Sequence, residues 1–117
     1  MNNIQKIGGL LAKEGRTIVY GIPQSAETDN VIALWLGDGE ESIRSLHDKR
    51  RAEYTVIETA VYASDYLSGY DLLLELKNEI GNAVKSTVAI MFMRILASEY
   101  DEKLQKHVLK AQYKIIE

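Results

Sequence analysis

The chain has 117 residues, 46% of them hydrophobic, which predicts one domain spanning residues 1–117 with a core of its own. Cysteine is absent, which excludes a disulfide framework and thiolate metal ligands, and the net charge of −3 argues against general attraction to polyanions. The longest apolar run, residues 88–96, is about half the length that a membrane-spanning helix needs.

The first segment predicts a short helix that docks on the rest of the chain. Asn2 or Asn3 can cap its start, and Gly15 is expected to end it. Gly8 and Gly9 weaken the helix, so docking is expected to stabilise it. Its apolar face consists of Ile4, Ile7 and Leu11.

Two strands are predicted next. Residues 16–22 predict a strand with Ile18, Tyr20 and Ile22 on one side, and it ends at Pro23, the only proline of the chain. Residues 30–37 are almost continuously apolar, which is typical of a strand covered on both faces. The polar stretches 24–29 and 40–50 are expected to be exposed connections.

Residues 51–81 organise the chain, because a hydrophobic period of two changes there into a helical one. Residues 53–62 are mostly β-branched or aromatic and apolar on both faces, which predicts an interior strand. Ser64 is expected to cap the following helix, and Gly81 to terminate it. The predicted stripe of this helix consists of Tyr66, Tyr70, Leu73, Leu76 and Ile80, widened by Leu72 and Leu74.

The last part of the chain predicts two more strands. Residues 87–96 predict a second buried strand, and residues 97–106 are expected to form a loop. The spacing of Tyr100, Leu104, Val108, Ala111 and Ile115 is compatible with a helix, which would include part of the expected loop. The alternation in residues 107–116 favours a strand there instead. The predicted fold is α+β, with two helices packed on a mainly antiparallel five-stranded sheet in the order α-β-β-β-α-β-β.

The candidate metal ligands have structural explanations. His47 and His107 each lack a second histidine three or four residues away, so no helical metal pair is expected. The acidic loop residues do not have the spacing of a calcium loop, so solvated loops are the preferred interpretation. These residues are Asp29, Asp38, Glu40 and Glu41. We therefore predict no metal site, no cofactor and no enzyme.

Three short motifs are also better explained by structure. Glu75 and Lys77 have the E-x-K spacing of some nucleases but lie on a predicted helix. The basic residues 49–51 lie beside two acidic stretches, so this positive cluster is only weak evidence for nucleic-acid binding. Gly8 and Gly9 lack the context of a phosphate-binding loop.

Two features of the sequence can be explained either by contacts between subunits or by packing within one domain. Glu58 is the charged residue among apolar neighbours on its strand face, as is common at a sheet edge or a subunit contact. The chain also has seven tyrosines against one Phe and one Trp, and tyrosine supplies apolar area with a polar tip. Core packing explains most of the tyrosines equally well.

The order and character of the segments resemble the tail terminator and minor capsid (head-tail joining) proteins of long-tailed bacteriophages. After the N-terminal helix, the segments that carry the resemblance are TIVYGIPQ, DNVIALWLGDG, ETAVYASDYLSGYDLLLELKNEIG, TVAIMFMRI and HVLKAQYKII. They cover nearly the whole chain. The sequence departs from this pattern in residues 40–48 and 97–106, where loop roles do not transfer.

The resemblance implies a structural phage or prophage protein without enzymatic activity. Such a protein forms a homo-oligomeric, hexameric ring that caps the tail tube, ends tail polymerisation and provides the head-tail joining surface. Its implied partners are the tail tube protein and a head completion protein, with no membrane and no sequence-specific nucleic acid. Its implied location is the virion, assembled in the bacterial cytoplasm.

The contacts of such a ring are expected in two places. Subunit or tube contacts are expected in residues 24–30 and 37–50, and exposed sheet edges are expected to pair across subunits. The acidic balance is expected to let DNA pass through the pore. The alternative is a small non-enzymatic binding or regulatory α+β module, which would remain one species at all concentrations.

Overall fold

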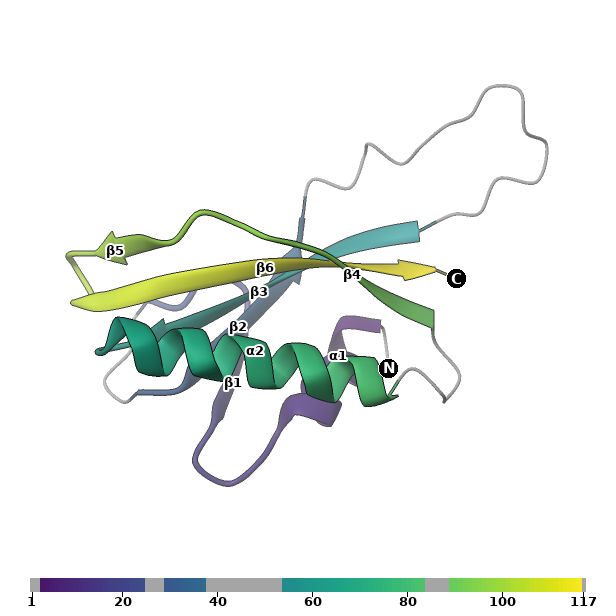
Figure 1. Cartoon of the computed structure of the whole chain (residues 1–117), viewed down its shortest axis with the longest axis horizontal. Helices are drawn as coiled ribbons and strands as arrows, with labels where there is room; N and C mark the ends of the chain where they lie inside the picture. The colour runs from purple at the N-terminus through teal and green to yellow at the C-terminus, as the bar shows by residue number, and fades with distance from the viewer. Residues whose placement is uncertain (1–2, 25–28, 38–53, 84–88, 117) are drawn as a thin grey trace.

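The computed structural model describes residues 3–24, 29–37, 54–83 and 89–116. The elements in these ranges are α1 (Asn3–Leu11), β1 (Thr17–Tyr20), β2 (Val31–Leu36), β3 (Tyr54–Ala63), α2 (Tyr66–Ala83), β4 (Ala89–Ile95), β5 (Glu99–Asp101) and β6 (Lys106–Ile116). The strands form one sheet, and both helices lie on the same face of it (Figure 1). The predicted α+β class is confirmed, and the described ranges contain six strands in place of the predicted five.

The strands lie in the order β1-β2-β3-β6-β4, and β5 also pairs with β6. Among the strands of the described residues, only β1 and β2 run parallel, so the sheet is mainly antiparallel, as predicted. Strand β3 lies between β2 and β6, which confirms the interior strand, and β6 confirms the strand interpretation of the tail. The missed strand β5 falls in the expected loop 97–106, because three residues are too few to show an alternation.

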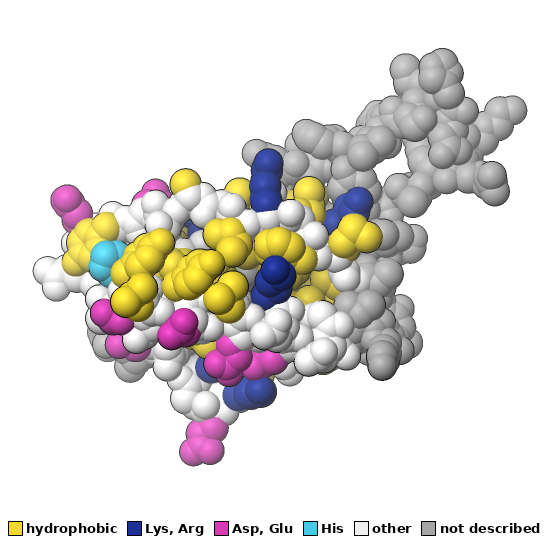
Figure 2. Space-filling view, in the orientation of Figure 1, with side chains coloured by type: hydrophobic (Ala, Val, Ile, Leu, Met, Phe, Trp, Pro, Cys, Tyr) yellow, Lys and Arg dark blue, Asp and Glu magenta, His cyan; other side chains and the backbone are white. Residues whose placement is uncertain are grey.

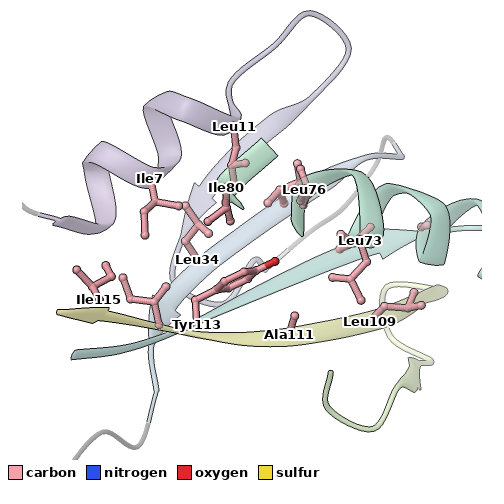
Figure 3. Close-up of a cluster of buried hydrophobic side chains, with 14 residues drawn as sticks. Ile7, Leu11, Leu34, Leu73, Leu76, Ile80, Leu109, Ala111, Tyr113 and Ile115 are labelled. Atoms are coloured by element: carbon pink, nitrogen blue, oxygen red, sulfur yellow. The ribbon is translucent and has the colours of Figure 1, made fainter. Parts of the chain in front are cut away.

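The main core lies between the helices and the sheet (Figure 3). Helix α1 contributes Ile7 and Leu11, and helix α2 contributes Leu73, Leu76 and Ile80, all at most 2% exposed. Burying five such side chains stabilises the fold by roughly 10 kcal/mol before chain entropy is subtracted. The sheet residues that they meet are Ile32, Leu34, Ile57, Val61, Leu109, Ala111, Tyr113 and Ile115.

Both predicted ends of α2 are wrong. The cap is Asp65, whose Oδ2 accepts hydrogen bonds from the backbone amide (2.9 Å) and the hydroxyl (2.9 Å) of Ser68. The hydrogen bond from the backbone amide is the main cause of the lowered pKa of Asp65. Ser64 instead donates its hydroxyl to Asp29. Gly81 lies inside the helix, which continues to Ala83, since an exposed helical glycine costs only about 1 kcal/mol. Tyr66, the first residue of the predicted apolar stripe of α2, is 42% exposed and is not part of the buried face.

The first helix and the first strand are shorter than predicted. Helix α1 ends at Leu11, and Gly15 lies in the turn that follows, with a φ of 87°. Strand β1 ends at Tyr20, because Gly21 has a φ of 98° and bends the chain before Pro23. The predictions overestimated both lengths because they placed each boundary at the next glycine or proline.

The prediction that residues 87–96 form a buried strand is wrong. Within the described part of the chain, β4 pairs only with β6 and is an edge strand. Ile90 and Phe92 pack against the core, whereas Met91, Met93 and Ile95 are 40–52% exposed. The register shifts between Phe92 and Arg94, which is a β-bulge. A nearly continuous apolar run, interrupted here by Arg94, does not distinguish an apolar edge strand from a buried one. In contrast, residues 31–34 of β2 are buried on both faces, as predicted.

Candidate functional site

The sheet face away from the helices carries a row of hydrogen-bonded side chains, here called the polar row. Glu58 on β3 is its centre: Oε1 accepts from Trp35 Nε1 (3.1 Å) and Oε2 accepts from Gln112 Nε2 (3.3 Å). Gln112 Oε1 in turn accepts from Arg94 Nε (2.9 Å). These residues are direct cross-strand neighbours on β2, β3, β6 and β4. The polar row therefore spans four strands.

The direction of donation in the polar row is fixed by chemistry. Arginine and indole nitrogens only donate, and a carboxylate only accepts, so Glu58 is the acceptor at which both arms of the row end. Sequence reasoning placed Glu58 at a sheet edge or a subunit contact, but it lies on the central strand. A Cβ at Gly37 would lie 3.1 Å from Glu58 Oε2, so the end of β2 packs closely over this carboxylate.

Around the polar row, the same face is covered by buried small and aromatic side chains. These are Val31, Ala33, Ala60, Tyr62 and Val108, with Val19, Trp35 and Leu104 packed against them. Burial is the main cause of the raised pKa of Tyr62, and the charges of Asp101 and Glu99 add to it. The face is therefore a second, smaller core, and the exposed Arg94 is where the row reaches solvent.

A second polar cluster joins three strand ends. Asp29 Oδ1 accepts from Lys106 Nζ (2.8 Å) and from the hydroxyl (2.7 Å) and amide (3.0 Å) of Ser64. The hydrogen bond from Lys106 and then that from Ser64 lower the pKa of Asp29 to about 2. Lys106 Nζ also donates to Ser64 Oγ (2.9 Å). Sequence reasoning missed this cluster because Lys106 lies 77 residues from Asp29.

The Ser64–Lys106 contact does not have the form of a serine–lysine catalytic pair. In such a pair the lysine must be neutral and must accept the serine proton. Here the serine hydroxyl donates to Asp29, and the lysine donates both to that same carboxylate and to the serine oxygen, so the serine proton is not directed at the lysine. Lys106 is only 8% exposed. The cluster is a structural tie that fixes the start of β2, the end of β3 and the start of β6 together.

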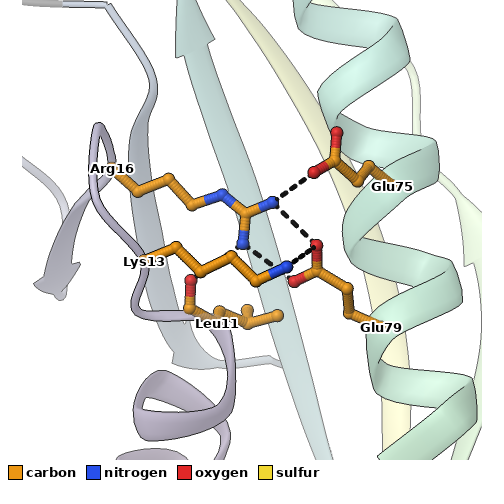
Figure 4. Close-up of polar contacts among 5 residues, drawn as sticks. All are labelled: Leu11, Lys13, Arg16, Glu75 and Glu79. Carbon is orange, nitrogen blue, oxygen red and sulfur yellow. Dashed lines mark hydrogen bonds and ion pairs between the residues drawn. The ribbon is translucent and has the colours of Figure 1, made fainter.

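A third cluster clamps the loop after α1 to helix α2 (Figure 4). Arg16 donates to Glu79 through Nη1 (2.8 Å) and Nη2 (2.8 Å), and Nη1 also donates to the carbonyl of Leu11 (2.9 Å). Arg16 Nη2 also reaches Glu75 (2.7 Å), and Lys13 Nζ reaches Glu79 (3.0 Å). The hydrogen bond from Arg16 is the largest cause that lowers the pKa of Glu79 to about 2.

The remaining sequence candidates do not converge. Glu75 bonds Arg16, whereas Lys77 lies over the ring of Phe92, 4.1 Å from its centroid, so the E-x-K pair points to two different sides of α2. His107 is half-buried and lies edge-on to Tyr66 and Tyr100. Asp38, Glu40, Glu41, His47 and residues 49–51 lie outside the described residues, as does most of the expected contact region 24–30 and 37–50.

Two negative findings concern the described ranges only. No group of three or more metal-ligating side chains occurs among residues 3–24, 29–37, 54–83 and 89–116. No helix within those ranges is long and apolar enough to cross a membrane.

Exposed apolar side chains occur at both edges of the sheet. On one edge, β4 exposes Met91 (52%), Met93 (41%) and Ile95 (40%). On the opposite edge, Tyr20 is 51% exposed on β1, and Ile22 just after it is 76% exposed. We call these surfaces the β4 edge and the β1 edge. Figure 2 shows hydrophobic side chains gathered in a band beside α2, with acidic side chains below it.

Comparison of the sequence with protein-family models and with curated proteins finds no match to either.

Proposed function

We propose that the chain is a structural subunit of a phage or prophage virion. It assembles into a homo-oligomeric ring, hexameric by the resemblance, that caps the tail tube, ends tube polymerisation and provides the head-tail joining surface. The observation that carries the proposal is the pair of apolar sheet edges on opposite sides of one small domain. The resemblance in element order supplies the specific role.

The edges support assembly for a physical reason. An exposed edge strand presents unpaired backbone donors and acceptors, and proteins that remain monomeric usually protect such edges with charge, proline or a covering segment. Here the β4 edge carries three exposed large apolar side chains, and its protection is limited to one charge, Arg94, and the β-bulge beside it. A ring needs two different contact surfaces on each subunit, and the two unlike edges of this sheet support such an arrangement.

The proposal is tested by locating the protein on tail tubes. The tail tube protein encoded in the same genome is polymerised, labelled full-length chain is added, and the tubes are imaged by electron microscopy. We expect label at one end of each tube and none along its sides. Label along the sides, or no label at either end, would contradict the proposal and favour a monomeric binding module.

A further inference from the structure

We propose that neighbouring copies of this chain join through their sheets, with the β4 edge of one copy pairing antiparallel with the β1 edge of the next. This inference rests on the proposed function, because it assigns the subunit contact of the proposed ring. The partner that binds each edge is therefore a second copy of the chain.

Strand direction supports this junction. Strand β4 is antiparallel to β6, β6 to β3, and β3 to β2, while β2 is parallel to β1. Strand β4 therefore runs opposite to β1. If a second copy is placed beside β4 with its helices on the same side of the sheet, its β1 meets β4 in the antiparallel orientation, the more stable pairing.

The backbone groups needed for this pairing face outward. On β1, the amides of Thr17 and Gly21 donate to Asn30 (3.2 Å) and Leu34 (2.8 Å), so the alternate amides of Ile18 and Tyr20 point away from β2. On the other edge, the Leu96 amide donates to Lys110 (2.9 Å), so the Ile95 amide points away from β6. Each edge thus presents donors to a new strand.

Side chains at the two edges are complementary in charge. Beside the β4 edge lie Lys77, over Phe92, and the exposed Arg94. Beside the β1 edge, Lys13 and Arg16 bond two carboxylates, Glu79 and Glu75, and the side chain of Glu75 is 57% exposed. A third carboxylate, the exposed Glu14, lies next to Lys13 in the sequence. Two cations against three carboxylates leave this edge negative. A two-fold contact between two β4 edges would instead bring the cations of both copies together.

Apolar side chains at the junction would be buried as well. Ile95 of one copy and Tyr20 of the next both lie on the helix-bearing side of the sheet, since their cross-strand neighbours Ala111 and Leu34 belong to the main core. Met93 and Ile22 add exposed apolar side chains at the same two edges. These four side chains are 40–76% exposed in one copy. A head-to-tail contact of this type uses different surfaces on the two partners, and it closes into a ring when the rotation per subunit divides a full turn.

The test uses one lysine substitution on each edge, since lysine blocks edge pairing. Met93→Lys alters the β4 edge, Ile22→Lys alters the β1 edge, and Leu67→Lys is the matched control, at a 69% exposed residue of α2 outside both edges. Circular dichroism checks that each variant is folded. Sedimentation velocity then measures self-association of each full-length variant over a concentration series.

We expect the wild-type chain and Leu67→Lys to associate alike, and each edge variant to associate at least about tenfold more weakly. Mixing the two edge variants should produce a one-to-one dimer and nothing larger. Each variant keeps one intact edge, and the two intact edges are complementary. Association of Ile22→Lys alone into a dimer would instead indicate a contact between two β4 edges and overturn the inference.

Other outcomes separate this inference from the proposed function. If both edge variants associate like the wild type, the ring forms through another surface, so the inference fails while the proposed function stands. A wild-type chain that remains one species at every concentration also overturns the inference. Loss of tube-end binding with association intact overturns the proposed function alone.

Discussion

Arg16 and Glu79 form a two-pronged ion pair, with both N–O distances at 2.8 Å, although 63 residues separate them. The pair is shielded from solvent, since the side chains are 6% and 19% exposed. Glu75, which also bonds Arg16, has a 57% exposed side chain. The two carboxylates therefore share one guanidinium in different environments, and this gives a matched pair of variants.

We expect Glu79→Gln to lower the free energy of unfolding by about 2 kcal/mol, because it leaves a shielded guanidinium without its main anion. The control Glu75→Gln should cost less than about 0.5 kcal/mol, since exposed ion pairs contribute little. Urea unfolding followed by circular dichroism measures both. Equal losses in the two variants would show that shielding does not set the strength of this cluster.

Acid should destabilise the chain in a defined range. The pKa of Glu79 falls from 4.5 to about 2 and that of Asp29 from 3.8 to about 2 in the folded chain. Because both values are lowered on folding, the unfolded chain takes up protons first as the pH falls. Stability from these pairs is therefore fully present above about pH 4.5 and is lost between about pH 4.5 and 2.

The acid effect can be assigned to Glu79 by substitution. The midpoint of thermal unfolding, measured from pH 6 down to about pH 2, should fall less steeply for Glu79→Gln than for the wild type. Identical slopes would show that the Arg16–Glu79 pair does not titrate as described.

Two glycines of α2 should respond in opposite directions to alanine. A Cβ at Gly69 would lie 2.8 Å from Leu109 Cδ1 and 3.0 Å from Ala63 Cβ, so Gly69→Ala should cost about 1 to 3 kcal/mol. A Cβ at Gly81 meets nothing within 4 Å, so Gly81→Ala should stabilise by about 0.5 to 1 kcal/mol through helix propensity. Thermal unfolding distinguishes the two. Stabilisation by Gly69→Ala would contradict the close packing of α2 on β3 and β6.

The polar row can be followed through Trp35, the only tryptophan of the chain. In Glu58→Gln, one side-chain oxygen replaces two, so a donor of Trp35 or Gln112 must face the new amide group. We expect a loss of about 1 kcal/mol and a shift in the Trp35 emission maximum. Glu99→Gln, which removes the exposed pair with Lys110 and leaves the hydrogen bonds of the polar row in place, is the control. An unchanged emission maximum in Glu58→Gln would contradict the hydrogen bond.

Much of the fold could be predicted from the sequence, because the spacing of hydrophobic residues differs between strands and helices. The change from a period of two to a helical period after residue 63 locates β3 and α2, and alternation in residues 107–116 identifies β6. Helix ends were less predictable, because Asp65 and Ser64 are both good caps and only the contact of Ser64 with Asp29 decides between them.

The candidate sites could not be predicted, because their members are distant in sequence. The Arg16–Glu79 and Asp29–Lys106 pairs depend on which strands become neighbours, and the polar row depends on the register of four strands. The edge position of β4 has the same origin. A run such as residues 89–95 indicates a strand, but its place in the sheet is set by the partners of β6.

The length distribution of tail tubes is the most direct test of the central claim, that this chain is a capping subunit. Tube protein is polymerised with and without the full-length chain, and tube lengths are measured by electron microscopy. We expect wild-type chain added during growth to shorten the tubes and stop their elongation. Tubes that grow to the same lengths with and without the chain would contradict it.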